Sequence, residues 1–519
     1  MTFISAVVAL AAVTAVAGCG ALLGFGDYSV DSSGDGGGSS EASTPEAGGD
    51  GPFDDGGCVD PTGFGGRGCY RCEPLTNDQL LSACTKSAFE PFDNELRISA
   101  FDPSNPKPPL PDGGPAYQSF DAGTPPVVNP GDAGPPDPCP IDPIDPGGRP
   151  NAVFLLGATG FPLDVIQRAI GTQASIFYAE KGSCEGSESI ISGNGKLTTG
   201  SKVTYYDENT GVAKSCTLQE DHPADLGMSA LFAETCSTPL PIDVQDLLGP
   251  VNPVGFTAPA TSNERVISGE GAYRVYGVVP SGVAPWDSEE FIFRRRPSSG
   301  NQTTIALTLG LENAAMRGRD SNGSSNMLKA MQGSSSPHKT IGISSSEILD
   351  INRASMKWLA YQHFGQPVGF YPDSEATTFD RRNVRDGHYF VWIPLHVYAR
   401  VSKGEIAGAP GQPVVGDTRT ATAVKTLAQL MTNRIAAPNP AVDLFSALGK
   451  IGNVPQCAMR VTRTKEGAQL TPFKPSLSCA CAFEAAVPNG IAPADCTRCT
   501  DNKQCTNPAR SSCSFGFCE

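Results

Sequence analysis

A continuous apolar run at residues 152–156 opens the part of the chain whose hydrophobic pattern predicts a folded body. A short run of this kind, followed by a glycine-rich turn at 157–160, is typical of a buried parallel strand. Residues 162–170 then carry apolar side chains at helical spacing, with proline near the first turn. Strand, turn and helix in this order are the opening of an α/β unit.

The same pattern continues downstream. Residues 174–178 are expected to form the next strand, and a glycine–serine turn at 182–187 leads into a helix. Residues 224–229 are typical of a strand end with a turn, and residues 425–434 of an amphipathic helix. Residues 304–309 fit either a strand or the start of a helix. We therefore expect an α/β fold.

Composition divides the chain into five segments. Residues 1–18 are predicted to be a signal peptide, 19–57 a flexible acidic tether, and 58–150 a spacer rich in cysteine and proline. The α/β body is expected to occupy residues 151–445. Residues 446–519 are expected to form a small module in which disulfides replace a hydrophobic core.

Charge and cysteine content narrow the class of protein. The 519 residues carry 38 basic and 54 acidic side chains, a net charge of −16, which is unfavourable for nucleic-acid binding. The 17 cysteines are typical of an oxidising compartment. Setting Cys19 aside leaves 16, which can all pair. Apart from the N-terminal segment, no apolar run is long enough to span a bilayer.

Residues 16–19, Val-Ala-Gly-Cys, resemble a bacterial lipobox, in which the cysteine sulfur is lipidated before cleavage. Several acyl chains on Cys19 would make a durable anchor in a lipid bilayer. The predicted location is the cell envelope, lipid-anchored on the periplasmic face or outer surface of a bacterial membrane. The segment lacks the basic residues of a usual signal peptide, and an ordinary signal peptide or short anchor helix is the alternative.

The sixteen cysteines other than Cys19 form three groups. Five precede residue 151, three lie in the body and eight follow, so complete pairing needs a bridge from the spacer to the body. Cys139 is the nearest candidate. The Cys-x-x-Cys pairs at 69–72 and 496–499 are interpreted as structural disulfides rather than metal or redox sites. Cys479 and Cys481 are expected to pair elsewhere, and no metal site is expected.

Three loops place small hydroxyl residues or glycine where a helix should begin: 157–160, 182–187 and 320–325. A helix N-terminus offers unpaired backbone N–H groups and the positive end of the helix dipole, both of which favour an anion. Arg317 and Arg319 precede the third loop. Each loop taken alone is more typical of a plain N-cap than of an anion site.

The collinear order of these motifs resembles the type II periplasmic solute-binding proteins, particularly the phosphate-binding branch. The motifs that carry the resemblance are residues 154–160, 182–186, 224–229, 319–324 and 389–396. Together they span roughly residues 151–435, and the last of them matches the family's return strand into the first lobe.

The resemblance implies a two-lobed clamp that holds a small, oxyanionic, phosphate-like solute. The first lobe would contain residues 151–245 and 389–435, the second most of 255–385, and a hinge motion would close them on the ligand. The resemblance implies no enzymatic step and no cofactor. A transport receptor of this type would meet a permease or another envelope protein.

The site residues implied by the resemblance are Ala158, Thr159, Ser183, Asp225, Arg319, Asn322, Gly323 and Ser324. Arg319 would supply the counter-charge, and Asp225 would accept a hydrogen from a protonated oxyanion. Two departures from the family concern these loops. Cys184 stands inside the second loop and would pair with Cys216 or Cys236, and Ala158 lacks a hydroxyl.

A second hypothesis is a surface-anchored structural or adhesive lipoprotein that keeps the fold without transport. The long tether and the added cysteine module favour it. An enzyme would need an activated nucleophile, and the sequence has neither a Gly-x-Ser-x-Gly elbow nor a complete P-loop. Glu289 and Glu290 with the arginines at 294–296 are interpreted as a solvated charged face.

The lipidation prediction can be tested on protein purified from a bacterial envelope. We expect intact-mass analysis to give a chain that begins at an acylated Cys19, because acylation of the cysteine accompanies cleavage before it. A mature chain that begins at any other residue would contradict the anchor.

Overall fold

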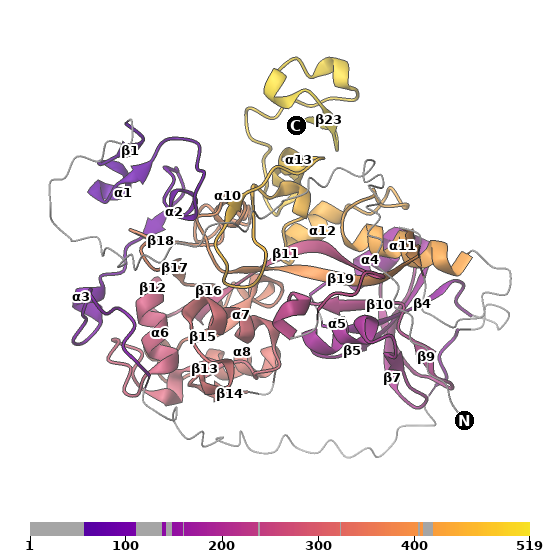
Figure 1. Ribbon diagram of the computed structural model, residues 1–519, viewed down its shortest axis with the longest axis horizontal. Coiled ribbons are helices and arrows are strands. Elements are labelled where there is room, and N and C mark those ends of the chain that lie inside the picture. The colour runs from indigo at the N-terminus through magenta and orange to yellow at the C-terminus, as the bar shows by residue number, and fades with distance from the viewer. Residues whose placement is uncertain are drawn as a thin grey trace, which may run out of the picture. The chain divides into compact units, whose positions relative to one another are not determined.

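The computed structural model describes the chain from residue 57 onward, with gaps (Figure 1). The described ranges are 57–110, 137–141, 148–158, 160–236, 239–321, 323–402, 405–407 and 419–519. Cys19, the predicted signal peptide and the predicted tether up to residue 56 lie outside them. Residues from 57 onward belong to one compact unit.

Parallel strands form the centre of a ten-stranded sheet. β4 (Ala152–Gly157) pairs in parallel with β5 (Ser175–Glu180) on one side and with β10 (Leu226–Ser229) on the other. β7 (Lys202–Tyr206) and β8 (Ala213–Thr217) extend the sheet beyond β5 in antiparallel fashion. The strands predicted from the apolar runs are therefore confirmed.

Two long strands connect this part of the sheet to the rest. β11 (Val244–Pro259) lies antiparallel to β19 (Trp392–Ser402), and β19 pairs with β10. Beyond a register shift between Leu248 and Val251, β11 continues into pairs with β15 (Gly342–Ser345) and β16 (Met356–Trp358). We call the β4–β5–β10 side the first half and the β15–β16 side the second half.

Helices cover both faces of the first half (Figure 1). α4 (Leu163–Ile170) and α11 (Arg419–Met431) pack together on one face, and α5 (Ser183–Ile191) packs on the other. Successive side chains of β4 point to opposite faces of the sheet. Val153 packs in the core under α4, and Phe154 packs in the core under α5. The mixed α/β class is thus confirmed.

The second half is built from α6 (Gly269–Gly277), α7 (Gly300–Leu309) and α8 (Ser324–Gln332) around β15 and β16, with the short α9 (Ser346–Leu349) after β15. The stretch 304–309, which fitted two structures in the sequence, is helical within α7. Its side chains are buried on nearly every side, so neither a helical stripe nor a strand alternation is visible in the sequence.

The predicted spacer at 58–150 is wrong for its first part. β3 (Phe89–Glu90) is the edge strand of a small sheet that also contains β12 (Val266–Ser268), β17 (Ala360–Gln362) and β18 (Gly369–Phe370). The preceding α2 (Asn77–Leu81) buries its two leucines in the main core. Residues 57–98 are therefore a cap on the second half, because their few apolar side chains find a partner surface there.

The remaining small elements complete the cap and the edges of the body. Their bounds are β1 (Val59–Asp60), α1 (Gly63–Gly66), β2 (Cys69–Tyr70), α3 (Asn94–Arg97), β6 (Lys196–Leu197), β9 (His222–Pro223), β13 (Phe293–Arg294), β14 (Arg319–Asp320), α10 (Arg382–Asp386), β20 (Glu405–Ala407), β21 (Val461–Thr462) and β22 (Thr471–Pro472).

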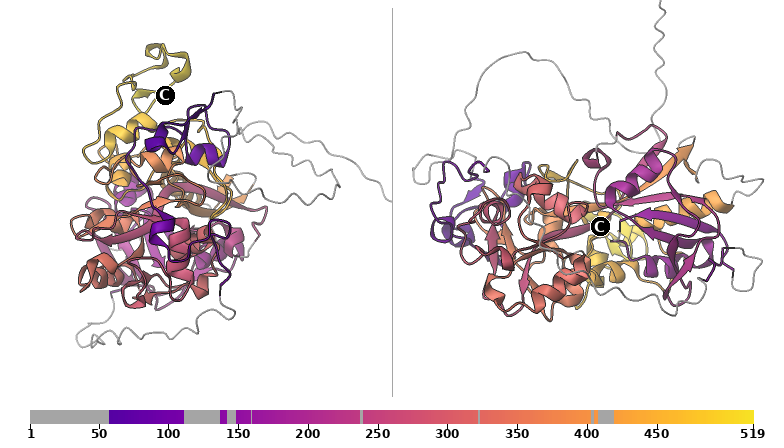
Figure 2. Two further views of the ribbon diagram at one scale, coloured as in Figure 1. Left: turned by 90° about the vertical axis from the view of Figure 1, so that its left-hand side faces the viewer. Right: turned by 90° about the horizontal axis from the view of Figure 1, so that it is seen from below.

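The predicted boundary at residue 446 is also wrong. After α12 (Leu444–Lys450) the chain returns to the main core, where Val454 and Phe483 are fully buried. α13 (Ala480–Ala486) packs on α12. The disulfide-rich region proper follows α13, with the hairpin of β23 (Cys513–Ser514) and β24 (Phe517–Cys518) (Figure 2).

All sixteen described cysteines form disulfides. The bridges are Cys58–Cys72, Cys69–Cys84, Cys139–Cys216, Cys184–Cys236, Cys457–Cys479, Cys481–Cys496, Cys499–Cys513 and Cys505–Cys518. The predicted bridge from Cys139 to the body is confirmed, as is the separate pairing of Cys479 and Cys481. No Cys-x-x-Cys pair closes on itself.

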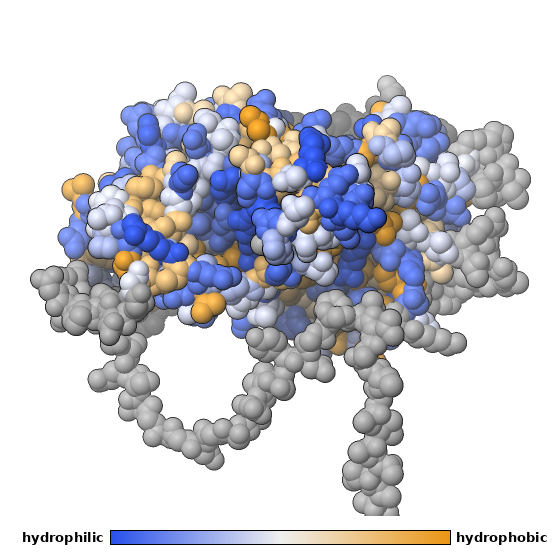
Figure 3. Space-filling model, turned by 90° about the horizontal axis from the view of Figure 1, so that it is seen from above, coloured by the Kyte–Doolittle hydropathy of each residue, from blue (hydrophilic) through white to orange (hydrophobic). Residues whose placement is uncertain are grey.

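One face of the molecule is largely hydrophilic. In Figure 3 hydrophilic residues cover much of the visible face, and apolar residues appear between them in separate places. No helix in the described ranges is long and apolar enough to cross a membrane.

A buried ion cluster joins three segments of the second half. Arg381 pairs with both Asp350 and Asp373, and Arg353 lies 2.6 Å from Asp373. Asp373 is 1 % exposed and also accepts a hydrogen bond from the Arg381 backbone at 2.9 Å. Because charges taken out of water need full pairing, removing one member leaves another uncompensated.

We expect Asp373→Asn to lower the free energy of unfolding by about 3–5 kcal/mol, because Arg353 and Arg381 would then share the single carboxylate of Asp350 and one buried positive charge would be uncompensated. The matched control is Asp386→Asn, which breaks a 3.0 Å pair with the half-exposed Arg460 and should cost about 1 kcal/mol or less. Denaturant unfolding with disulfides intact measures both. Equal losses for the two variants would contradict the prediction.

Candidate functional site

A cavity of about 980 Å³ lies between the two halves, beside the crossing strand β11. Ala158 and Ser183 line it from the first half, Ser299 and Ser324 from the second, and Asn252 from β11. We call this cavity the cleft. Its position follows from the topology, because the turns after β4 and β5 lie at the carboxyl ends of parallel strands.

The N-terminus of α5 forms one wall of the cleft. Ser183, the first helical residue, is buried, and its Oγ accepts a hydrogen bond from Ala230 N at 3.3 Å. Glu185 turns back to accept from Gly182 N at 2.7 Å, which satisfies one donor of the first turn. The adjacent Cys184 is bonded to Cys236, so the loop is stapled to the segment after β10.

The N-termini of α7 and α8 form the opposite wall. Ser299 caps α7, and Gly300 is packed so closely that an added Cβ would lie 2.9 Å from Ser183 Oγ. Ser324 begins α8 after Gly323, which has φ +128°, a backbone conformation that glycine adopts without strain. Three helix N-termini therefore face one cavity and supply backbone N–H groups and positive dipole ends.

Arg295 supplies side-chain positive charge to the cleft. It follows β13 (Phe293–Arg294) and lines the cavity together with Arg296. Its Nε is buried and has no hydrogen-bond partner among the described residues. Burial lowers the pKa of the Arg295 guanidinium, while the nearby Glu347 carboxylate acts to raise it.

This placement corrects the interpretation of residues 294–296 as a solvated face. Arg294 is only 7 % exposed and donates from Nε to Gly318 O at 3.1 Å, so it is a structural residue. Arg295 is partly buried in the cleft, and Arg296 is exposed at its rim. The three adjacent arginines thus have three different environments.

A network of hydrogen bonds forms the floor of the cleft. Glu347 accepts from Asn252 Nδ2 and from Ser345 Oγ, both at 2.7 Å. Ser345 Oγ in turn accepts from Asn301 Nδ2 at 2.7 Å, at the start of α7. The carboxylate of Glu347 is therefore held in place by neutral donors, and it lies in the same cavity as Arg295.

Four of the predicted site residues line the cleft: Ala158, Ser183, Gly323 and Ser324. The first two come from the first half and the last two from the second half, more than 100 positions further along the sequence. Thr159 and Asn322 lie outside the described residues. The binding role of the whole set stays a prediction.

The other two predicted residues do not line the cleft. Asp225 is buried just before β10, where its carboxylate accepts a hydrogen bond from Phe154 N at 2.9 Å and so joins β10 to β4. Arg319 is exposed, donates to Glu290 O at 3.3 Å, and places its guanidinium 5.4 Å from the Phe293 ring centroid. The arginines that line the cleft are Arg295 and Arg296, and Arg319 is not among them.

The sequence also indicates the wall of the cleft at the N-terminus of α7, although none of the three predicted loops includes it. Residues 297–301, Pro-Ser-Ser-Gly-Asn, have the same small-residue character as the three loops and directly follow Arg295 and Arg296. The signal is visible only if residues 304–309 are assigned to a helix, because a small-residue loop binds anions at a helix start and not at a strand start.

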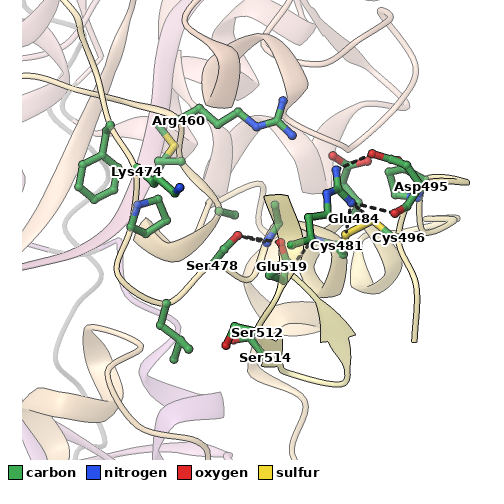
Figure 4. A pocket seen from close by; sticks show the side chains of 18 of the residues that line it. Arg460, Lys474, Ser478, Cys481, Glu484, Asp495, Cys496, Ser512, Ser514 and Glu519 are labelled. Atoms are coloured by element: carbon green, nitrogen blue, oxygen red, sulfur yellow. Dashed lines mark hydrogen bonds and ion pairs between the residues drawn. A yellow bond between two sulfur atoms is a disulfide. The ribbon is translucent and has the colours of Figure 1, made fainter. Parts of the chain in front are cut away.

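A second cavity, of about 650 Å³, lies in the C-terminal region (Figure 4). Most of its charged residues are already paired. Arg510 binds Asp495, and Arg382 lies 3.0 Å from Glu484. Glu519 accepts from Ser478 Oγ at 2.7 Å, as the dashed line in Figure 4 shows. These contacts hold the C-terminus to the body, so the cleft between the halves is the stronger candidate site.

Comparison with known proteins gave similarities in structure only. No protein-family model and no curated protein sequence matches the chain. Among solved structures, the chain is similar to an ABC-type phosphate transport receptor from Vibrio cholerae, with 11 % identity and a TM-score of 0.33 over 54 % of this chain and 97 % of that one. It is also similar to PstS from Borrelia burgdorferi, with 11 % identity and a TM-score of 0.32 over 59 % of this chain and 98 % of that one.

A different kind of protein gives a similar match. The regulatory domain of OxyR2 from Vibrio vulnificus aligns with 8 % identity and a TM-score of 0.26, over 54 % of this chain and 95 % of that one. The similarity in all three cases extends over little more than half of the chain.

Proposed function

We propose that the cleft binds a small oxyanionic, phosphate-like solute and performs no chemical step. The observation that carries the proposal is the position of Arg295 beside the N-termini of α5, α7 and α8. The partly buried guanidinium lines the cavity with its Nε unpartnered among the described residues. An anion would receive backbone N–H groups from the helices and charge-assisted hydrogen bonds from Arg295.

The size and polarity of the cleft support a small hydrophilic ligand. Its walls contain serine, glycine and asparagine, and its volume of about 980 Å³ leaves room for ordered water around an ion. Glu347 sits in the same cavity, and its carboxylate favours a ligand that also carries a hydrogen-bond donor. A protonated oxyanion has both an acceptor and a donor.

We propose further that the protein works in the bacterial cell envelope as a lipoprotein, anchored through acylated Cys19, with a permease or another envelope protein as partner. Eight disulfides are consistent with an oxidising compartment. The alternative is a surface-anchored structural or adhesive lipoprotein, in which the cleft has no solute.

Isothermal titration calorimetry with phosphate, sulfate, molybdate and small carboxylates tests the binding proposal. We expect at least one oxyanion to bind, and Arg295→Gln to weaken that binding roughly 10- to 100-fold, the loss of about 1.5–3 kcal/mol that accompanies removal of a charged hydrogen bond. Arg319→Gln is the matched control, because it removes an arginine of the same region that does not line the cleft. It should bind as the wild type does.

Two results would overturn the proposal. One is the absence of heat with every anion at millimolar concentration, which would favour the structural alternative. The other is an equal effect of Arg295→Gln and Arg319→Gln, which would show that general surface charge rather than the cleft attracts the anion.

A further inference from the structure

The segment after α12 contacts both halves of the molecule beside the cleft. Residues 452–467 follow the last helix of the α/β body and cross from one half to the other. They form a third connection in addition to β11 and β19. We call residues 452–467 the strap.

Asn453 makes the most direct bridge within the strap. Its side chain is fully buried, and its Nδ2 donates to Gly160 O in the first half at 2.9 Å. Its Oδ1 lies 3.2 Å from Ser346 Oγ in the second half. Gly160 ends the turn that contains Ala158, and Ser346 precedes Glu347, so one amide group connects the two walls of the cleft.

The crossing strand β11 is also held by the strap. Val454 and Val251 exchange two backbone hydrogen bonds, at 2.6 and 2.8 Å, where β11 shifts its register against β19. The Ser346 hydroxyl also lies 2.8 Å from Asn252 Oδ1, which ties Asn453 into the floor network. The point at which a hinge would bend is therefore covered by an additional strand segment.

The far end of the strap makes a second bridge. Glu466 is buried and accepts hydrogen bonds from Phe232 N, at 2.7 Å, and from Thr235 Oγ1, both in the first half. The next residue, Gly467, packs on the C-terminal turn of α7, where an added Cβ would lie 3.1 Å from the Leu307 carbonyl. Adjacent residues thus contact opposite halves.

We propose that Asn453 and Glu466 are positioning residues that hold the two walls of the cleft at a fixed separation, so that the site is assembled before the solute arrives. Opening the halves would break the bond of Asn453 to Gly160 or its contact with Ser346, depending on which half the strap follows, and would leave a buried polar group unpaired, which is costly. With the two walls held by the strap, the site is preformed, and the hinge closure expected from the resemblance does not take place. The affinity part of this proposal rests on the proposed anion binding.

Small-angle X-ray scattering of the full chain, with and without saturating inorganic phosphate, tests the fixed separation. We expect the same radius of gyration in both states for the wild type. The variant Asn453→Ala/Glu466→Ala should have a larger radius without phosphate and contract when phosphate is added. Its apparent Kd for phosphate should rise by about tenfold if roughly a tenth of the molecules keep the assembled cleft.

Asn383→Ala is the matched control, because Asn383 is fully buried and its Nδ2 donates to Tyr371 O and Asp373 O, both within the second half. It should lower the melting temperature while leaving the radius and the Kd unchanged. If the double variant does not fold, the single variant Asn453→Ala takes its place in the scattering and binding measurements.

The outcomes separate the two proposals. The proposal of a fixed separation would be overturned if the radius of gyration of the wild type decreased on phosphate binding. It would also be overturned if the radius of the Asn383→Ala variant increased as much as that of the strap variant. If calorimetry shows no binding of phosphate to the wild type, the proposed function loses its phosphate-like solute, and the strap is judged from the radii of the free proteins alone.

Discussion

The pairing of β11 with β19 is the constraint on which the rest of the structure depends. Both strands pass from the first half to the second, and their hydrogen bonds fix the relative position of the two groups of helices. β10 pairs with β19, which places the turns after β4 and β5 next to the helices that follow β13 and β14. The cleft exists because this one strand pair carries helix N-termini from both halves to the same place.

Buried arginines occur in two different electrostatic settings. Arg381 is fully buried and neutralised by Asp350 and Asp373, so it binds structural segments together. Arg295 is partly buried in a cavity, and its Nε lacks a protein partner in the described part of the chain. Because a buried donor without a partner is unfavourable, the Nε of Arg295 costs stability that an acceptor in the cavity would offset.

The additions to the α/β body are integrated with it rather than attached in series. The cap at residues 57–98 contributes an edge strand to the second half, and the strap contributes buried side chains to the core of both halves. Disulfides close the cap and the C-terminal hairpin, where little apolar surface is available. A further disulfide, Cys184–Cys236, lies beside the cleft itself, so covalent bonds and packing both stabilise the body.

By itself the sequence determined the α/β class, the central strands and the N-terminal loops of α5 and α8, because apolar periodicity and small-residue turns act locally along the chain. By parity it also indicated a bridge from the spacer to the body, for which Cys139 was the nearest candidate. Only the tertiary structure decided which arginine enters the cleft, because Arg295 and Arg319 are alike in sequence and differ only in what packs around them. It likewise decided that residues 452–467 join the two halves, since the bonds of Asn453 link residues nearly 300 positions apart, a separation at which no local pattern is informative.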